Sequence, residues 1–397
     1  MSKGKSPTAN AVSAEAGRPK GRLLALDILR GITIAGMILV NNPGSWGHIY
    51  APLEHASWNG LTPTDLVFPF FMFIMGVSTY MSLRKYDFRL SGSLLWKVLR
   101  RAVVIWFIGL AIAWFGLFLR GILNEATLWE AVWNFDHIRI LGVMPRLAIC
   151  YGTGSLIAVL VGRKGVPWVI ATMLVAYSVI LLLGHGFEFS DRNVISVVDH
   201  KVLGPDHMYA DTIDGVRLKF DPEGLLSTLP SIAHMLIGFM CGFLLMGTKD
   251  NRERINRLFI VGTILTFSGF LLDFGLPINK KIWSPSFVLT TCGLASSFLG
   301  LLIWIIDICG HKKWCRFFEA FGINPLFMYC LGAVLSIVIG SVKIGDMSIK
   351  GHIYKDFLMP VCGEDATLAS LVFALLFVGV NWCVGYVLYK KKIYIKI

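Results

Sequence analysis

Ten apolar runs of helical length alternate with short polar segments along the 397-residue chain. Each run is close to the roughly 20 residues that a helix needs to cross a bilayer. The predicted spans are residues 24–41, 66–83, 101–119, 140–161, 166–183, 227–246, 257–274, 286–307, 319–341 and 366–389. The pattern predicts an all-α multi-pass membrane protein with about ten transmembrane helices, of which the first and seventh have the weakest pattern.

Composition agrees with this fold class. Hydrophobic residues make up 55% of the chain and charged residues 16%, and the mean hydropathy of +0.66 is far above that of soluble domains. The eight cysteines show neither a disulfide framework nor a zinc-ligand spacing, so we expect no metal site. No HExxH, Walker A or GxSxG motif is present.

The net charge of +12 is distributed unevenly between alternate loops. Of the 37 Lys and Arg residues, 24 fall on one side of the predicted spans and eleven on the other. The positive-inside rule then predicts that both termini are cytoplasmic and that the loops at 42–65, 184–226 and 275–285 face outward. The basic balance thus indicates topology, and we expect no nucleic-acid partner.

Two regions flank or interrupt the spans. Residues 1–22 are polar and predict a disordered cytoplasmic arm, so that residues 23–397 form the transmembrane domain, whose first helix serves as an uncleaved insertion signal. The long outer loop at 184–226 carries Asp206 and His207 and ends with Asp221 and Glu223. A loop of this length is either functional, for example as a substrate lid, or a plain spacer.

A polar loop between the first two spans is the strongest candidate for chemistry. It contains His55, Trp58 and Asn59, with Asn41 at one edge and Asp65 at the other. Taken alone, His55 could be an exposed loop residue and Trp58 an interfacial anchor. Together they place an imidazole, which can take a proton near neutral pH, beside an amide, a carboxylate and an indole.

Polar residues within the predicted spans are further candidates. Arg30 can pair with Asp27 one turn earlier, and is either a snorkelling side chain or an anion site. Arg146 lies deeper, where an ionisable group favours a ligand path or a buried ion pair. Asn324 precedes Pro325 and predicts either a simple kink or a polar opening. Gly238 and Gly242 form a GxxxG motif that we interpret as helix packing.

Several stretches together resemble the heparan-alpha-glucosaminide N-acetyltransferase family of transmembrane acyltransferases. The most distinctive is 55–62, with the order His-Ala-Ser-Trp-Asn-Gly-Leu-Thr. The others are 26–31, 37–41, 65–69, 142–147, 204–209, 221–224, 280–284 and 389–393. The resemblance therefore extends over nearly the whole chain.

The resemblance implies an enzyme that moves acetyl from cytoplasmic acetyl-CoA to the amine of a terminal glucosamine on the far side of the membrane. His55 matches the family's active-site histidine and Asn41 the asparagine paired with it. Lysosomal members have an additional N-terminal luminal region, so the short polar arm suggests a bacterial inner-membrane member with a periplasmic active-site loop. A homodimer is a family expectation.

These implications assign roles to the candidates. His55 would act as the base, and Asn41 would donate to the oxyanion. The donor phosphates would be held by Arg100 and Arg101, with Arg30 deeper and Arg146 and Asn324 along the conduit. The acceptor, a cationic amino sugar, would meet acidic residues, His207 and an indole that stacks on the ring. The residues on this side are Trp58, Asp65, Asp206, His207, Asp221, Glu223 and Trp283.

Three questions stay open at the level of sequence. His55 could act only as a base or could itself become acetylated. The chain could instead be a transporter of a small anion or sugar, although no inverted repeat is evident. The acceptor could also be a hydroxyl of a surface polysaccharide.

Overall fold

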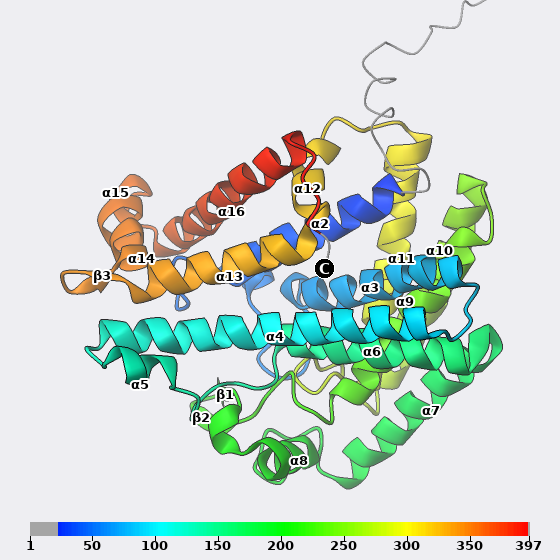
Figure 1. The fold of residues 1–397 in the computed structure, drawn as a ribbon, viewed down its shortest axis with the longest axis horizontal. Coiled ribbons are helices and arrows are strands. Elements are labelled where there is room, and N and C mark those ends of the chain that lie inside the picture. The colour runs from blue at the N-terminus through cyan, green and yellow to red at the C-terminus, as the bar shows by residue number, and fades with distance from the viewer. Residues whose placement is uncertain (1–22, 396–397) are drawn as a thin grey trace, which may run out of the picture.

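The structure, a computed structural model, describes residues 23–395 as a bundle of helices with two small β-hairpins (Figure 1). The predicted arm at 1–22 lies outside the described residues. The elements up to the long outer loop are α2 (Leu24–Val40), η1 (Ala51–Leu53), η2 (Pro63–Leu66), α3 (Val67–Leu83), η3 (Arg84–Tyr86), α4 (Gly92–Leu123), α5 (Leu128–Val132), α6 (Val143–Leu160) and α7 (Gly162–Leu183). The loop and the helices that follow it are α8 (Val194–Leu203), η4 (Pro205–His207), β1 (Ala210–Ile213), β2 (Val216–Lys219), α9 (Thr228–Met246), α10 (Asn251–Asp273), α11 (Pro285–Ile303) and η5 (Trp304–Ile308). The remaining elements are α12 (Cys315–Gly322), α13 (Pro325–Ser341), β3 (Lys343–Ile344), β4 (Met347–Ser348), α14 (Ile349–His352), η6 (Ile353–Leu358), α15 (Met359–Val361) and α16 (Ala366–Lys390).

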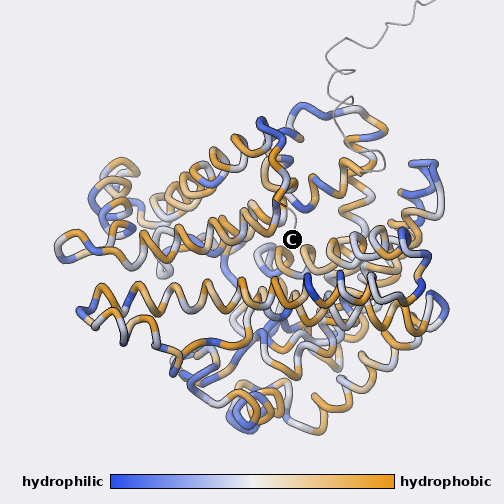
Figure 2. The backbone as a smooth tube through the Cα atoms, in the orientation of Figure 1, coloured by the Kyte–Doolittle hydropathy of each residue, from blue (hydrophilic) through white to orange (hydrophobic). Residues whose placement is uncertain are grey.

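The predicted fold class, an all-α multi-pass membrane protein, is confirmed. Within residues 23–395, eight helices are long and apolar enough to cross a membrane, or nine if the bent pair α12–α13 is one span. Apolar residues follow the helices, and polar residues gather in their connections (Figure 2). The first predicted span corresponds to α2, which has 17 residues. The number of ten spans and the cytoplasmic side of both termini remain predictions.

The helices divide into a buried set and a peripheral set. In the most apolar 18-residue stretch of α9, 72% of the residues are buried, whereas in the corresponding stretch of α4 only 11% are buried. The buried helices α3, α6, α9 and α11 contribute to one large core, while α4 packs along α6 and α10 packs along α11 from outside. The outer faces of α4 and α10 are apolar and are suited to lipid.

Small residues allow the central helices to approach closely. A Cβ on Gly238 would overlap the Phe73 carbonyl oxygen, and one on Gly76 would overlap the Met235 carbonyl oxygen. Gly242 meets Val77 and Tyr80 in the same crossing of α3 and α9. The interpretation of the GxxxG motif as helix packing is therefore confirmed, and the packing is within the chain.

The interruption predicted at Asn324 and Pro325 is also confirmed, since α12 and α13 meet at a bend of 83°. The Asn324 side-chain amide donates to the Ile393 carbonyl at 2.8 Å, and its oxygen accepts from the Ile395 backbone N–H at 2.8 Å. Only 2% of Asn324 is exposed. In the structure this side chain fastens the C-terminal segment to the bend.

The long outer loop is folded and packs on the helix ends. It contains α8 and the antiparallel hairpin β1–β2, with Ala210 opposite Lys219. Phe187, Phe189 and Phe220 from this loop surround Trp58 of the His55 loop in a separate apolar cluster. The segment is a cap in direct contact with the candidate loop, and its role as a lid stays a prediction.

Candidate active site

His55 lies in a three-residue polar cluster with Asp65 and Lys280. Its Nδ1 is 2.7 Å from Asp65 Oδ1 and 2.9 Å from Lys280 Nζ, and Lys280 Nζ is 3.2 Å from the same Asp65 oxygen. The His55 side chain is 38% exposed, whereas Asp65 is 1% exposed. The cluster is therefore a buried carboxylate that holds one edge of an imidazole while the ring remains accessible.

Local sequence explains how Asp65 is held. Thr62 and Asp65 form a capping box at η2, in which Pro63 occupies the first turn. Asp65 Oδ2 accepts from the backbone N–H groups of Thr62, at 3.2 Å, and Ala56, at 3.1 Å. These bonds leave Oδ1 for His55 and Lys280, and they fix the carboxylate before α3 begins.

Lys280 is placed by the turn between α10 and α11. The Gly60 backbone N–H donates to the Ile278 carbonyl at 2.7 Å, and the Asn279 amide donates to Asn59 Oδ1 at 3.1 Å. At the other end of the turn, Ser284 caps α11 by accepting from the Phe287 N–H. The turn is thus fastened to both the His55 loop and the core.

This geometry favours proton transfer by the outer edge of the imidazole. His55 Nδ1 can donate to Asp65 or accept from Lys280, depending on the tautomer of the ring. In the tautomer in which Nδ1–H donates to Asp65, the lone pair of Nε2 points away from the carboxylate and can take a proton. The carboxylate then stabilises the positive charge that develops on the ring. The arrangement is that of a general base with a fixed orientation.

Asn41 ends α2, and its side chain is exposed, while the neighbouring Asn42 is buried with its amide on the Ile38 carbonyl at 2.7 Å. Among the hydrogen bonds of residues 23–395, none joins the Asn41 side chain to His55. The structure thus brings His55 together with Asp65, and the oxyanion role of Asn41 stays a prediction.

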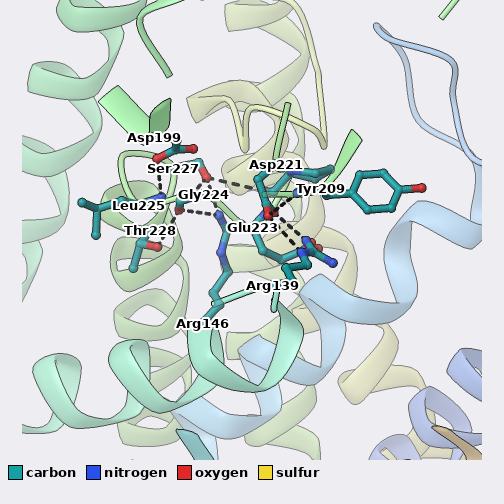
Figure 3. Close-up of polar contacts among 11 residues, drawn as sticks. Arg139, Arg146, Asp199, Tyr209, Asp221, Glu223, Gly224, Leu225, Ser227 and Thr228 are labelled. Atoms are coloured by element: carbon teal, nitrogen blue, oxygen red, sulfur yellow. Dashed lines mark hydrogen bonds and ion pairs between the residues drawn. The ribbon is translucent and has the colours of Figure 1, made fainter. Parts of the chain in front are cut away.

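The acidic residues at the end of the outer loop surround Arg139 (Figure 3). Arg139 Nη2 lies 2.5 Å from carboxylate oxygens of both Asp221 and Glu223, and the guanidinium stands 5.1 Å from the centre of the Tyr209 ring. Burial alone would lower the pKa of Arg139, but the carboxylates of Glu223 and Asp221 outweigh it and raise that pKa above its ordinary value. Asp221 and Glu223 therefore already have a cationic partner.

Asp206 and His207 lie in η4, beside the segment that leads to α6. Asp206 is 3.6 Å from His137, with both side chains largely exposed. His207 Nδ1 lies 2.8 Å from the Ile138 carbonyl. Asp206 is accessible to a ligand, whereas His207 links two outer segments.

Arg146 and Trp283 are buried together behind the site. Arg146 is 0% exposed and donates to the Gly224 carbonyl at 3.1 Å and to the Ser227 hydroxyl (Figure 3). Its guanidinium stacks on Trp283 at 5.3 Å, and Trp283 is 1% exposed. Among the described residues Arg146 hydrogen-bonds to these neutral groups and forms no ion pair, and its place in a ligand path stays a prediction. A sugar could reach the Trp283 ring only after this packing opened.

Trp58 is similarly occupied by packing. Its indole N–H donates to the Phe187 carbonyl at 2.7 Å, and its ring lies 5.3 Å from Phe189 and 5.4 Å from Phe220. The ring joins the His55 loop to the outer cap, and its stacking on a pyranose stays a prediction.

Asp199 of α8 is a buried carboxylate close to the segment that carries Asp221 and Glu223. One oxygen accepts from the Leu225 backbone N–H at 2.8 Å, and the other has no partner within the part of the chain that the structure describes. Burial raises the pKa of Asp199 to about 6, with a further contribution from Asp221. Gly224 leaves room for this carboxylate, because a Cβ at position 224 would overlap it unless the Asp199 side chain moved.

Asp199→Asn should remove a pH-dependent component of stability. The folded protein binds the Asp199 proton more tightly than the unfolded chain, so this carboxyl favours folding below about pH 4, and the benefit is lost as pH rises through about 6. The loss is about 2–3 kcal/mol at most. The melting temperature of Asp199→Asn in detergent, relative to that of the wild type, should therefore rise from pH 4.5 to pH 7.5. The exposed Asp191→Asn is the control; the same trend there would contradict this assignment.

A cavity of about 570 Å³ opens at the other end of α2 and α3. Its lining includes Arg30, Arg84, Lys85, Asp27 and Ser78. The predicted pairing is confirmed, since Arg30 lies 3.0 Å from Asp27, and it also donates to Ser78 at 2.8 Å.

Arg100 and Arg101 of α4 do not line this cavity. Arg100 is exposed, and Arg101 stacks on Tyr151 at 4.8 Å. Within the described residues, no group of three or more His, Cys, Asp or Glu side chains could hold a metal ion.

Lys280, Arg139 and Asp199 have clear structural partners but were not predicted as site residues. Lys280 belongs to a stretch that carries the family resemblance, although the charge pattern shows it only as an outward cation. Its partners Asp65 and His55 lie more than 200 residues earlier. No local pattern marks such a pairing.

The fold and site define a multi-pass α-helical membrane protein with an accessible histidine on a buried carboxylate. No family model matches the sequence. Two curated proteins are similar over 95% of this chain, the heparan-alpha-glucosaminide N-acetyltransferases of Mus musculus, at 27% identity, and Homo sapiens, at 28%. This chain is therefore similar to those two proteins over nearly its whole length. The chain spans 60% of the length of each relative.

Proposed function

We propose that this protein is a transmembrane N-acetyltransferase. It would move acetyl from acetyl-CoA, bound at the cytoplasmic side, to the amine of glucosamine or of a glucosamine-terminated glycan at the outer side. The supporting observation is that one helix pair, α2–α3, carries a basic cavity at one end and the His55–Asp65 pair at the other. The relatives named above are acetyltransferases by name, which supports the reaction class.

The basic cavity suits the nucleotide part of the donor. Arg30, Arg84 and Lys85 outnumber the single carboxylate of Asp27 in its lining, and guanidinium and ammonium groups bind phosphates well. Its position agrees with the charge pattern, which has most cations at the cytoplasmic ends of the helices. Acetyl-CoA is a co-substrate in this proposal, and the chemistry needs no metal.

The two ends are a distance apart that a long, thin acyl carrier can bridge. Ten residues of α2 lie between Arg30 and Asn41, so the two are about 16 Å apart along the helix axis. On the antiparallel helix, Ser78 contacts Arg30 and Asp65 precedes the first turn. The proposal has the phosphates at the Arg30 end and the thioester at the His55 end, with the pantetheine arm between helices.

At the outer end, His55 would take the proton of the attacking amine while Asp65 stabilises the imidazolium. Asn41, whose side chain is exposed at the end of α2, would donate to the oxyanion. Exposed Asp206 would attract the cationic acceptor. Direct transfer and transfer through an acetyl-His55 intermediate use the same groups.

The location belongs to the same proposal: an inner membrane with the His55 loop on the periplasmic face. It is supported by the charge pattern alone. A homodimer is proposed only from the family, because Gly238 and Gly242 are used within the chain.

Proteoliposomes containing the purified protein test the function. With acetyl-CoA on one side and a glucosamine-terminated oligosaccharide on the other, we expect N-acetylated product by mass spectrometry together with release of free CoA. Accumulation of sugar or anion without CoA release would instead identify a transporter. A base-labile acetyl ester on a polysaccharide would identify an O-acyltransferase.

A further inference from the structure

Lys280 occupies the edge of His55 that faces away from the proposed reaction. Its Nζ lies 2.9 Å from His55 Nδ1 and 3.2 Å from Asp65 Oδ1. Because Nε2 is on the opposite side of the imidazole, a group beside Nδ1 acts on His55 without contacting the reacting atoms. Lys280 is thus a candidate for a positioning residue.

The contact is held by the two residues that precede Lys280. Ile278 and Asn279, immediately before it, bond to Gly60 and Asn59 of the His55 loop. The Lys280 side chain is 18% exposed, so its ammonium is confined and only partly hydrated. Such a side chain keeps its position relative to the imidazole.

The charges around Lys280 determine what it does. Asp65 of η2 is 3.2 Å away, Glu223 of the outer loop attracts it from further off, and the neighbouring Lys281 is paired with Asp211 at 2.6 Å. Burial lowers the pKa of Lys280 below its ordinary value, and Asp65 and Glu223 oppose this effect. The two carboxylates favour the ammonium form.

Lys280 and a protonated His55 compete for one oxygen. His55 Nδ1 and Lys280 Nζ both contact Asp65 Oδ1, because Oδ2 accepts from the backbone of Ala56 and Thr62. At 2.9 Å the Lys280 ammonium can donate to Nδ1 only when that nitrogen carries no proton, and its charge repels a positive charge on the ring. Asp65 favours imidazolium, and Lys280 limits that preference.

We propose that Lys280 keeps His55 unprotonated before substrate binds, and so sets the lower pH limit of acetyl transfer. The inference rests on the proposed function for its consequence in catalysis. The protonation state of His55 itself can be measured without an assay of enzymatic activity.

The test compares the pH dependence of His55 carbethoxylation by diethylpyrocarbonate, which modifies neutral imidazole, in the full-length protein. Mass spectrometry of the peptide that contains His55 gives the midpoint pH, at which His55 is modified at half its maximal rate. Lys280→Met should raise it by about one pH unit or more, because the repelling charge is lost and Asp65 Oδ1 is no longer shared. Lys280→Arg, which keeps the charge, and Lys281→Met, the same change one residue along, should stay near wild type. The acidic side of the pH profile of acetyl transfer should shift in the same direction as this midpoint.

An unchanged or lower midpoint in Lys280→Met would overturn the inference, even if transfer slowed, because a merely structural role would not raise it. Lys280→Gln provides a second neutral variant if the methionine protein does not fold. Failure of the proposed function has a different signature, which is shifted His55 modification with no acetyl transfer by any variant or by the wild type.

Discussion

Replacing His55 with alanine is expected to slow acetyl transfer by at least about 100-fold while leaving acetyl-CoA binding unchanged. The physical reason is the separation of the two ends of α2–α3. The cavity proposed for the donor includes Arg30, Arg84 and Lys85, and none of its lining residues belongs to the His55 loop. Transfer rates and donor binding, measured on the same purified protein, should therefore respond independently.

His48→Ala provides the matched control, because His48 is an exposed histidine of the same loop. It should transfer acetyl like the wild type. Near wild-type transfer by His55→Ala would exclude His55 from the chemistry. A parallel loss of donor binding would instead indicate that the loop has collapsed, which the melting temperature would report.

The helices could be predicted from sequence because their pattern is local. An apolar run of about 20 residues needs no partner to identify it. The bend at Asn324 is equally local, since Pro325 cannot continue the backbone hydrogen-bond ladder of α12. The polar opening that this asparagine might have lined could not be decided locally, because its amide bonds to the C-terminal segment about 70 residues later.

Half of the histidine site could be predicted for the same reason. His55 and Asp65 are ten residues apart in one short polar loop, so their proximity is visible in the sequence. Lys280 comes from a turn 225 residues away and is placed by backbone bonds to Gly60 and a side-chain bond to Asn59. Such a contact depends on how α11 packs, which no residue pattern encodes.

The aromatic residues show the opposite error of local reasoning. An indole in an outer loop favours an interfacial or sugar-binding role. Trp283 instead enters the core, with a positive backbone φ of 54° that is uncommon for a bulky residue. It then packs against Arg146, Phe68 and Phe287. The same loop that exposes Lys280 to His55 buries this ring.

The outer acidic residues illustrate the role of charge pairing. Asp221 and Glu223 were expected to meet a cationic acceptor. Arg139, which is 82 residues before Asp221, already binds both. An acceptor amine must therefore compete with a guanidinium there, whereas Asp206 is exposed beside His137. Under the proposed function, the acceptor would therefore be recognised at the outer rim and not at the buried cluster.

Asp65→Asn is expected to slow acetyl transfer about as severely as loss of His55, by roughly 100- to 10,000-fold. The amide oxygen can replace Oδ2 as acceptor for Ala56 and Thr62, which preserves the η2 cap. The amide nitrogen then faces His55 Nδ1 and donates to it, so the ring proton moves to Nε2. The edge that should take the amine proton is blocked.

A comparison with Asn41→Ala separates the orienting role of Asp65 from the proposed oxyanion role of Asn41. An oxyanion donor acts on the transition state and not on the imidazole proton, so its loss should lower the rate constant by about 100- to 1,000-fold with the pH profile unchanged. Asp65→Asn should change both the rate and the profile, because it removes the charge that stabilises imidazolium. Rate-against-pH curves for the two proteins, with melting temperatures to exclude unfolding, distinguish the partners. A shifted profile in Asn41→Ala together with an unshifted one in Asp65→Asn would reverse the assignment, and would make Asn41 the group that orients His55.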